Sequence, residues 1–213
     1  MSLQINEIFY SIQGESTYVG RPCVFVRLTG CNLRCWWCDT TYAFYEGEQC
    51  SVEQVLEQVR AYKCPLVEIT GGEPLLQDEV YPLIDRLLLE GYEVLIETGG
   101  SLSVHRLDPR VVKILDFKAP GSGMDPHNNP ENLRYLDRKD QIKFVVSDRR
   151  DYEWAKQVMT EYALTEKTQV LFSAVLDELH PSELAEWLLA DRLDARLQIQ
   201  LHKYLWDPKR RGV

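Results

Sequence analysis

The chain alternates apolar, β-rich runs with amphipathic helical stretches along most of its length. Helices are predicted at residues 51–62, 79–91, 149–162 and 181–192. Strands are predicted at residues 23–29, 66–70, 92–98, 111–118, 141–147 and 168–175, with a final strand or extended tail at 195–205. Ser51 and Gln54 fit a helix capping box, and Gly91 is placed to end the second helix. Repeated strand–helix units of this kind predict an α/β fold in which helices connect parallel strands.

The length of the chain limits how far that sheet can close. Six or seven strands in 213 residues are too few for a complete eight-stranded barrel, which takes about 250 residues. An open, partial barrel or a doubly wound sheet remains. Residues 121–130, rich in Gly, Asn and Pro, predict a surface loop. Because no repeat or linker interrupts the pattern, we expect a single domain over residues 1–213.

Charge and hydropathy argue against several classes of function. The 24 basic and 33 acidic residues give a formal net charge of −9, whereas nucleic-acid binding normally requires a basic surface. No apolar run reaches the roughly 18–20 residues that a membrane-spanning helix needs, and the first residues lack the pattern of a secretory signal. We therefore expect a cytoplasmic protein that binds neither nucleic acid nor membranes.

Three of the six cysteines lie in one short segment. Cys31, Cys35 and Cys38 have the spacing Cys-x3-Cys-x2-Cys, which in a reducing compartment indicates metal or redox chemistry rather than disulfides. Three thiolates from one loop can bind three irons of a 4Fe-4S cluster and leave the fourth iron open to a substrate or cofactor. The alternatives are a structural zinc site, whose fourth ligand would have to come from elsewhere, and unrelated buried cysteines. The other three show no metal-ligand spacing: Cys23, Cys50 and Cys64.

The cysteine spacing resembles that of the radical S-adenosylmethionine (SAM) superfamily, in which such a loop binds a 4Fe-4S cluster whose open iron chelates SAM. The turn GGEP at residues 71–74 follows a predicted strand, as the turn that binds the SAM amino group does, although alone it would also fit an ordinary tight turn. Asp-Phe-Lys at residues 116–118 ends another strand and by itself would fit a surface ion pair. The resemblance implies that SAM is bound by the following residues: Trp37, Cys38, Asp39, Gly72, Glu73, Glu97, Asp116 and Lys118.

A denser resemblance begins upstream and continues to the end of the chain. The segment INEIFYSIQGES at residues 5–16, Gly-Arg-Pro at 20–22 and the cysteine segment resemble the 7-carboxy-7-deazaguanine synthase family, as do GGEP, Asp-x-Lys and the late Gln-x-His-Lys. That family is a narrower group within the radical SAM superfamily, and the resemblance implies a partial (open) parallel β/α barrel of about six strands. The resemblance implies that substrate is bound by the following residues: Ile12, Gln13, Gly14, Glu15, Arg27, Thr70, Gln200 and His202.

The residue types fit a carboxylated, bicyclic substrate. The planar guanidinium of Arg27 can hold a carboxylate through two parallel hydrogen bonds, and Gln13 and Glu15 can bond the amino and ring N–H groups of a pterin. Without the resemblance, Arg27 would also fit a surface ion pair and Glu15 a solvated loop. We expect Gln200 and His202 to share one face of the final strand.

The resemblance also implies a reaction and its cofactors. A 4Fe-4S cluster and SAM would generate a 5′-deoxyadenosyl radical that takes hydrogen from C6 of 6-carboxy-5,6,7,8-tetrahydropterin. The ring then contracts and ammonia leaves, which gives 7-carboxy-7-deazaguanine for 7-deazapurine and queuosine biosynthesis. Thr40 would be the protein ligand of a Mg²⁺ ion bridged to substrate, although a turn role also fits a lone threonine. No side chain is expected to be a catalytic residue itself.

The resemblance implies partners as well, and rival functions remain. A flavodoxin- or ferredoxin-type reductant and a homodimer are expected. The basic tail at residues 208–213 fits either a loose end or a substrate lid. One rival is a radical SAM activase that makes a glycyl radical on a partner protein. The other is a non-enzymatic zinc or iron–sulfur module.

Overall fold

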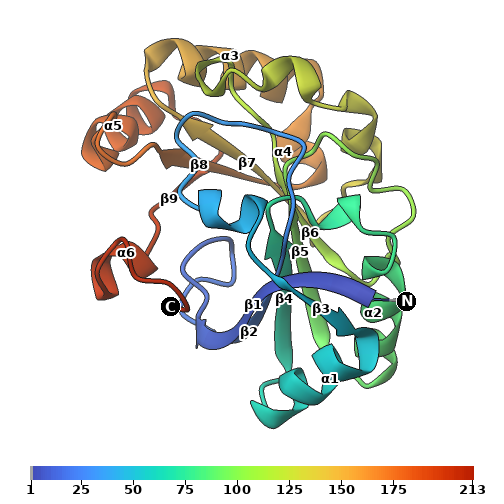
Figure 1. Cartoon of the computed structure of the whole chain (residues 1–213). Helices are drawn as coiled ribbons and strands as arrows, with labels where there is room; N and C mark the ends of the chain where they lie inside the picture. Colours follow the sequence, from blue (N-terminus) through green and yellow to red (C-terminus); the bar gives the residue numbers. More distant parts are fainter. Residues whose placement is uncertain (1) are drawn as a thin grey trace.

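The computed structural model describes residues 2–213 and contains one nine-stranded sheet with helices along its outer side (Figure 1). The strands are β1 (Ser2–Ile12), β2 (Pro22–Leu28), β3 (Glu48–Ser51), β4 (Leu66–Gly71), β5 (Glu93–Thr98), β6 (Val112–Asp116), β7 (Gln141–Val146), β8 (Gln169–Ala174) and β9 (Arg196–Gln198). The α-helices are α1 (Val52–Ala61), α2 (Val80–Leu89), α3 (Arg149–Glu161), α4 (Leu164–Lys167), α5 (Pro181–Asp191) and α6 (His202–Leu205). Short 3-10 helices are η1 (Thr41–Phe44), η2 (Pro74–Leu76), η3 (Pro120–Ser122), η4 (Asp125–His127) and η5 (Pro130–Tyr135).

The sheet is an open barrel. Its strands are hydrogen-bonded in the order β3-β1-β2-β4-β5-β6-β7-β8-β9, so β3 and β9 are separate edges. From β2 onward the strands pair in parallel, while β1 is antiparallel to both β2 and β3. The parallel strands follow chain order without a reversal, which distinguishes this sheet from a doubly wound one. The prediction of a partial parallel β/α barrel is therefore confirmed.

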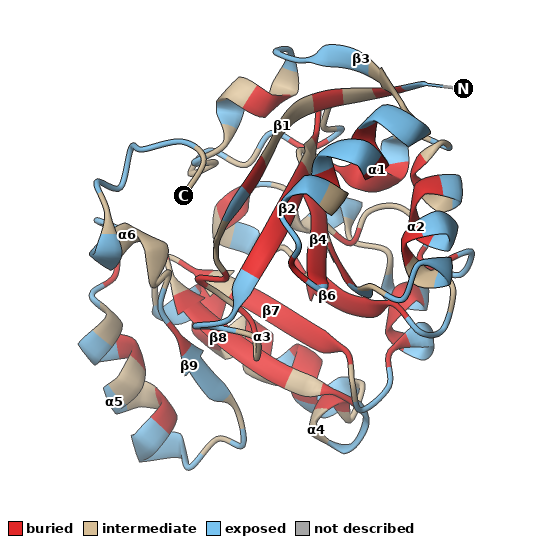
Figure 2. Cartoon of the chain, turned by 90° about the horizontal axis from the view of Figure 1, so that it is seen from below, coloured by how far each residue is buried: buried red, intermediate tan, exposed pale blue. Residues whose placement is uncertain are grey.

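Local sequence signals account for the helix ends. Ser51 Oγ accepts a hydrogen bond from the Gln54 backbone N–H, and the Gln54 side chain accepts one from the Ser51 backbone N–H, so the predicted capping box is present. Gly91 has φ +86 just after α2, a left-handed conformation that favours glycine and ends the helix there. Figure 2 shows β2, β4 and β7 as buried and the outer faces of the helices as exposed. Within residues 2–213, no helix combines the length and hydropathy that crossing a bilayer requires.

The prediction of a final strand or extended tail over residues 195–205 holds only for its first part. The strand β9 ends at Gln198, and the short helix α6 begins at His202. Contacts with the loop after β1 draw the chain off the sheet. The Gln198 side-chain oxygen accepts from Ser16 N at 2.7 Å, and Leu201 N donates to the Gly14 carbonyl at 2.9 Å. The late Gln-x-His pair therefore does not share one face of a strand.

The sequence patterns also missed three elements. These are β1 and β3, which extend the sheet at its N-terminal edge, and the single-turn helix α4. β1 carries polar residues at both inward and outward positions, so its alternation is weak, and β3 has only four residues. Such strands are recognised through their partners rather than through their own pattern.

Candidate functional site

Inward-facing side chains of the parallel strands line a cavity of about 820 Å³. Side chains alternate along a strand, so each strand presents every second residue to this space. Loops at the C-terminal ends of the strands complete the lining of the cavity. Barrel enzymes carry their active sites at this end of the strands. The polar residues that the strands contribute to the lining are Arg27 of β2, Glu68 and Thr70 of β4, Glu97 and Thr98 of β5, Asp116 of β6, Lys143 of β7 and Ser173 of β8.

The cavity collects nearly all the residues that the sequence indicated. Those that line it are Ile12, Gln13, Gly14, Glu15, Arg27, Cys31, Cys35, Trp37, Cys38, Asp39, Thr40, Thr70, Gly72, Glu97, Asp116, Lys118, Gln200 and His202. Glu73 is the exception, because its side chain is fully buried outside the lining. The lining residues come from both ends of the sequence, so the site depends on the whole fold.

The cysteine loop lies between β2 and η1 at the mouth of the cavity. Cys31, Cys35 and Cys38 are each half-buried with free thiols. Trp36 anchors the loop, since its Nε1 donates to the Gly121 carbonyl at 2.6 Å. The indole remains 59% exposed, which places this side of the loop within reach of a partner protein.

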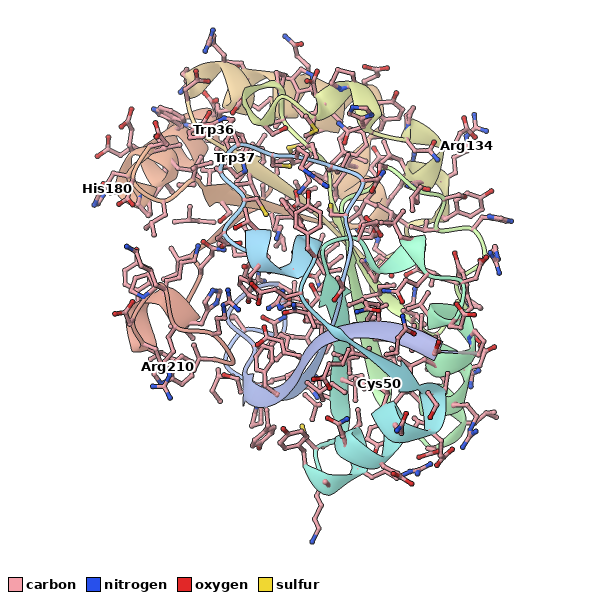
Figure 3. The ribbon with its side chains drawn as sticks, viewed as in Figure 1. Trp36, Trp37, Cys50, Arg134, His180 and Arg210 are labelled. Atoms are coloured by element: carbon pink, nitrogen blue, oxygen red, sulfur yellow. The ribbon has the colours of Figure 1, made fainter. Side chains whose placement is uncertain are left out.

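The remaining cysteines lie away from this loop. Cys23 and Cys64 are buried, and Cys50 sits on β3. Figure 3 shows Cys50 near α1, well separated from Trp36 and Trp37. The cysteines that lack ligand spacing in the sequence thus also lie outside the cavity lining.

Three thiols match the number of protein ligands of an open 4Fe-4S cluster, whereas a structural zinc site needs four ligands. Within residues 2–213, no group of three or more His, Cys, Asp or Glu side chains is gathered closely enough to hold one metal ion. A structural zinc needs four ligands around one ion, whereas the cysteines of a 4Fe-4S cluster each bind a different iron and stand further apart. Burial raises the pKa of all three loop thiols, and Lys118 opposes that shift. Iron would therefore displace thiol protons on binding.

The turn at residues 71–74 packs directly against the cysteine loop. The Glu73 backbone N–H donates to the Gly30 carbonyl at 2.8 Å. A Cβ on Gly72 would lie 2.3 Å from the Gly30 oxygen and 2.7 Å from Cys31 Cβ, so no larger residue fits without moving backbone. Glycine here lets the turn approach the loop that carries the thiols.

The Glu73 side chain ties that turn to the end of β5. Its carboxylate accepts from Thr98 Oγ1 and from the Gly99 backbone N–H, each at 2.8 Å, and from Leu75 N at 3.0 Å. The Glu73 carboxylate is thus engaged within the protein, and the contact of Glu73 with SAM stays a prediction.

Asp116, at the end of β6, has one carboxylate oxygen without a partner. Its Oδ2 lies 2.9 Å from Lys118 Nζ and 3.6 Å from Lys143 Nζ. Its Oδ1 is buried and has no hydrogen-bond partner among residues 2–213. Burial raises the pKa of Asp116, but the two lysines outweigh it and hold the pKa below its usual value. A buried ionised oxygen without a donor is costly, and a hydroxyl of a bound ligand such as the SAM ribose would satisfy it.

Lys143 is the centre of the charged layer inside the barrel. Its Nζ lies 3.0 Å from Glu15 Oε2, 3.6 Å from Asp116 Oδ2 and in contact with Glu97 Oε1. Burial lowers the pKa of Lys143, but these three carboxylates outweigh it and raise the pKa well above its usual value. The ammonium is therefore fully charged and links the loop after β1 to strands β5, β6 and β7.

Glu15 is held rigidly by its neighbours. Besides Lys143, Gln198 Nε2 donates to its Oε2 at 2.8 Å and Gln200 Nε2 to its Oε1 at 2.9 Å. Gln13 Oε1 accepts from the Glu15 backbone N–H at 2.5 Å. Burial raises the pKa of Glu15, yet Lys143 and the amides outweigh it, so the carboxylate is ionised. The side chains of Gln13 and Glu15 are thus held in place by contacts within the protein.

His202 closes over the same loop. A Cβ on Gly14 would lie 2.3 Å from His202 Nδ1, so the glycine makes room for the imidazole. Burial lowers the pKa of His202 and outweighs the nearby Glu15, which keeps the ring neutral at pH 7. The loop after β1 and the helix α6 near the end of the chain therefore meet at one site.

Arg27 faces the cavity from β2 and has free donors. Its Nε donates to Glu7 Oε1 at 2.8 Å, and Tyr42 OH donates to the same oxygen at 3.0 Å. The two terminal nitrogens of Arg27 have no partner among the hydrogen bonds and ion pairs of residues 2–213. A guanidinium held at Nε presents that free edge to a carboxylate.

Thr40 and Asp39 form the other wall of the mouth. Thr40 Oγ1 donates to Asp39 Oδ1 at 2.9 Å, and Lys203 Nζ lies 2.6 Å from Asp39 Oδ2. Burial raises the pKa of Asp39, but Lys203 outweighs it and the carboxylate stays ionised. The Thr40 hydroxyl is engaged by Asp39 alone, so its lone pairs are available to a hard cation.

The basic tail folds back over the cavity mouth. Residues 208–213 all belong to the lining. Arg211 stacks on the Tyr42 ring at 3.7 Å from its centroid and lies 2.7 Å from Glu46. These contacts favour the lid alternative over a loose end.

Sequence reasoning missed Glu68 and Lys143 as cavity residues. Each is a single charged residue inside an apolar strand, LVEIT and QIKFVVS. The available signal was its period-two relation to other polar positions, since Glu68 shares a face with Thr70 on β4.

The thiol loop, the glycine turn and the open barrel together define a class of enzyme. A family model for the radical SAM superfamily matches residues 25–116, which span the cysteine loop, the turn and strands β4 to β6. This chain is thus a radical SAM protein, whose cofactors are a 4Fe-4S cluster and SAM.

Comparison with curated proteins narrows the class. The 7-carboxy-7-deazaguanine synthase of Chlorobaculum tepidum is 47% identical over 214 residues, covering 99% of this chain and 97% of the relative. The synthase of Koribacter versatilis is 46% identical over 226 residues, covering 99% and 100%. The crystal structure of QueE from Escherichia coli has a TM-score of 0.78 at 27% identity, covering 95% of each chain. The chain therefore belongs to the 7-carboxy-7-deazaguanine synthase family.

Family membership confirms the expected fold type, lyase class and two cofactors. It also decides between the functions that the sequence left open. Relatives that match over nearly their full length are named 7-carboxy-7-deazaguanine synthase. These names argue against a glycyl-radical activase and against a non-enzymatic zinc or iron–sulfur module.

Proposed function

We propose that this chain converts 6-carboxy-5,6,7,8-tetrahydropterin to 7-carboxy-7-deazaguanine with loss of ammonia, as a ring-contracting radical SAM lyase of queuosine biosynthesis. One observation carries the proposal beyond family membership. The three-thiol loop opens on the same 820 Å³ cavity as the QGE segment and the free edge of Arg27. A reductively activated cofactor and a carboxylated bicyclic ligand can therefore meet in one enclosed space.

The cofactor side of the cavity lies beneath the cysteine loop. We propose that Cys31, Cys35 and Cys38 hold the cluster, which with SAM supplies the one-electron chemistry that removes a hydrogen atom from substrate. Asp116 offers its unpartnered oxygen to a SAM hydroxyl, which is supported by the burial of that oxygen. The other proposed SAM contacts on the lining are Trp37, Cys38, Asp39, Gly72, Glu97 and Lys118, and Glu73 is proposed from the turn that follows Gly72.

The substrate side lies between β2 and the QGE segment. We propose that Arg27 binds the substrate carboxylate through its two terminal nitrogens and that Glu15 accepts from ring N–H groups. The support is geometric, since Glu7 orients the guanidinium and Lys143 and two glutamines orient Glu15. Further proposed contacts are Ile12, Gln13, Gly14, Thr70, Gln200 and His202, which all line the cavity.

Mg²⁺ is proposed as a further cofactor with Thr40 as its protein ligand. Magnesium prefers hard oxygen ligands and keeps several waters, so one hydroxyl plus a substrate carboxylate is a sufficient set. The position of Thr40 on the cavity lining, next to the ionised Asp39, supports this role. The ion would orient the carboxylate and stabilise charge that develops on it.

Partners and context are also proposals. A flavodoxin- or ferredoxin-type protein would reduce the cluster, and the exposed Trp36 beside the thiols leaves that face accessible. A homodimer is supported by the exposed Leu197 and Ile199 on and after the edge strand β9. Cytoplasmic location fits the free thiols of the cysteine loop. A single domain over residues 1–213 fits the one continuous sheet.

The deciding experiment is anaerobic turnover. The protein is reconstituted with iron and sulfide, then given SAM, Mg²⁺, a chemical reductant and the tetrahydropterin, and products are identified by mass spectrometry. We expect methionine, 5′-deoxyadenosine and 7-carboxy-7-deazaguanine. SAM cleavage without the deazaguanine would refute the proposed substrate, and a colourless protein that holds one zinc ion would refute the cofactor.

A further inference from the structure

Glu68 is a buried acid on β4 that none of the roles above uses. It is only 2% exposed and lines the cavity. Its register partners are Phe25 of β2 and Leu95 of β5, so it lies one inward-facing position further from the cysteine loop than Thr70 does. Glu68 therefore belongs to the floor of the cavity, meaning the inward-facing layer that Phe25 and Glu68 form below Thr70.

The neighbouring Gln13 amide is fixed in one orientation. Its Oε1 accepts from the Glu15 backbone N–H at 2.5 Å, so its Nε2 is the atom that donates to Glu68 Oε2. An amide nitrogen only donates, and Glu68 Oε2 is consequently an acceptor. A proton on this carboxyl must therefore be carried by the other oxygen, Oε1.

The second carboxyl oxygen of Glu68, Oε1, faces the cavity. It has no partner among the hydrogen bonds and ion pairs of residues 2–213. Among those residues, Asp116 Oδ1 is the only side-chain nitrogen or oxygen atom that is fully buried and lacks a hydrogen-bond partner. Glu68 Oε1 is thus unpartnered but accessible, and its carboxyl is held from behind by Gln13.

The charged groups around Glu68 favour its neutral form. Glu97 faces it from β5, Glu15 from the loop after β1 and Lys143 from β7, while β2 contributes the apolar Phe25. Burial and then Glu97 raise the pKa of Glu68 to about 8, with Glu15 adding to the shift and Gln13 and Lys143 opposing it. On β2, Arg27 lies one inward-facing position away and is paired with Glu7. Asp116 acts on the layer through the shared Lys143.

We propose that Glu68 contacts substrate directly, donating a hydrogen bond from its neutral carboxyl, through Oε1, to an acceptor atom of the bound bicyclic ring. The ring atom is a carbonyl oxygen or an unprotonated nitrogen, because those are the acceptors of a pterin-type ring. The inference rests on the proposed function, since it takes such a ring as the ligand. Under this proposal Glu68, on the floor of the cavity, determines specificity for the ring, while Arg27 binds the carboxylate.

The test compares Glu68→Gln with Glu68→Leu. Glutamine keeps a donor, an acceptor and the shape of the neutral acid, whereas leucine keeps only the volume. Binding of the oxidised, fluorescent 6-carboxypterin is titrated between pH 6.5 and 9 on protein that carries its cluster and SAM. Glu57→Gln, the same chemical change at an exposed position of α1, is the matched control.

The readout is the ratio of the Kd of wild type to the Kd of Glu68→Gln at each pH, because ionisation of the ligand affects both proteins alike. We expect a ratio near one at pH 6.5–7 that rises by about tenfold at pH 9, as the wild-type carboxyl loses its proton. Glu68→Leu should bind about tenfold more weakly than wild type at pH 7. SAM affinity and the Glu57→Gln titration should not change.

Each contrary result overturns the inference. A ratio that stays flat would show that the Glu68 proton is not used, and a ratio that falls with pH would show an ionised acceptor instead. Glu68→Leu that binds as tightly as wild type would show no contact at all, and if that variant does not fold the Glu68→Gln ratio still decides. Failure of the proposed function looks different, because wild type would then bind no 6-carboxypterin at any pH and form no deazaguanine.

Discussion

Lys143→Met removes the ammonium group that three carboxylates of the cavity share. The lysine is 5% exposed, with Glu15 Oε2 at 3.0 Å, Asp116 Oδ2 at 3.6 Å and Glu97 in contact. At an effective dielectric of about 20, one pair at such a distance attracts by about 5 kcal/mol, part of which offsets the cost of burying the ammonium. We expect the variant to lose about 3–5 kcal/mol of unfolding free energy at pH 7, the usual cost of leaving buried charge unpaired.

The pH dependence carries the sharper part of the prediction. In wild type the pKa of Lys143 is raised, so its stabilising contribution is fully present at pH 7 and is lost only in strong alkali. The pKa values of Glu15 and Asp116 are lowered, so their contributions are lost as pH falls below about 4. In Lys143→Met the main group that opposes burial is lost, although Lys118 remains beside Asp116 and two glutamine amides remain on Glu15. We therefore expect the carboxylate pKa values to rise, and that of Glu97, already raised by burial in wild type, to rise most. Such groups destabilise the fold less once protonated, so the deficit should shrink from pH 8 to pH 5.

The assay is urea unfolding at pH 5, 6, 7 and 8, followed anaerobically by tryptophan fluorescence and circular dichroism on proteins of equal iron content. Lys167→Met, which removes an exposed lysine from α4, is the control and should change the unfolding free energy by less than about 0.5 kcal/mol. A Lys143→Met deficit below about 1 kcal/mol at pH 7, or one that is constant with pH, would refute the reasoning about the shared ammonium.

Further substitutions probe other parts of the site. Cys38→Ala should lower the iron content after anaerobic reconstitution and abolish SAM cleavage. The control Cys50→Ala, outside the cavity, should change neither property. Equal iron content in the two variants would contradict the cluster assignment. Thr40→Val should abolish the stimulation of turnover by Mg²⁺, and Thr40→Ser should retain it, as measured by a Mg²⁺ titration of product formation. An unchanged titration of Thr40→Val would refute the proposal that Thr40 is a Mg²⁺ ligand. Glu73→Ala should lose about 2–4 kcal/mol of unfolding free energy, because buried donors including Thr98 Oγ1 lose their acceptor, and a loss below about 1 kcal/mol in urea unfolding would show that water replaces the carboxylate.

The parallel strands and the thiol loop could be predicted because each depends on short-range pattern. The strands are apolar runs bounded by turns, and the three thiols lie within eight residues of sequence, Cys31 to Cys38. The end of the chain could not be predicted in this way. Its path after β9 is set by hydrogen bonds to Ser16 and Gly14, at the other end of the sequence, and no local pattern reports such contacts.

Lone charges inside strands show why the charged layer escaped prediction. Lys113 on β6 and Lys143 on β7 look alike in sequence, each flanked by apolar residues. Lys143 faces the cavity and Lys113 pairs with Asp140 at 2.9 Å outside the lining. Which side of a strand faces inward is set by its register in the sheet, and a shift of one residue would exchange the two roles. The fold therefore had to be known before Lys143 could be assigned to the site.

The net charge of −9 does not show how charged side chains are arranged within the cavity, and that arrangement matters for the proposed ligands. In the charged layer around Lys143, the carboxyl groups of Glu15, Glu97 and Asp116 outnumber the ammonium groups of Lys118 and Lys143 by one. SAM, with its sulfonium and ammonium, has a net positive charge and complements that layer. An anionic substrate carboxylate would be repelled from that layer, which agrees with the proposal that it binds at the free edge of Arg27 on β2. An ionised Glu68 would add a second negative charge to the floor and oppose entry of an anionic ring, so the neutral state of this buried acid serves binding as much as recognition.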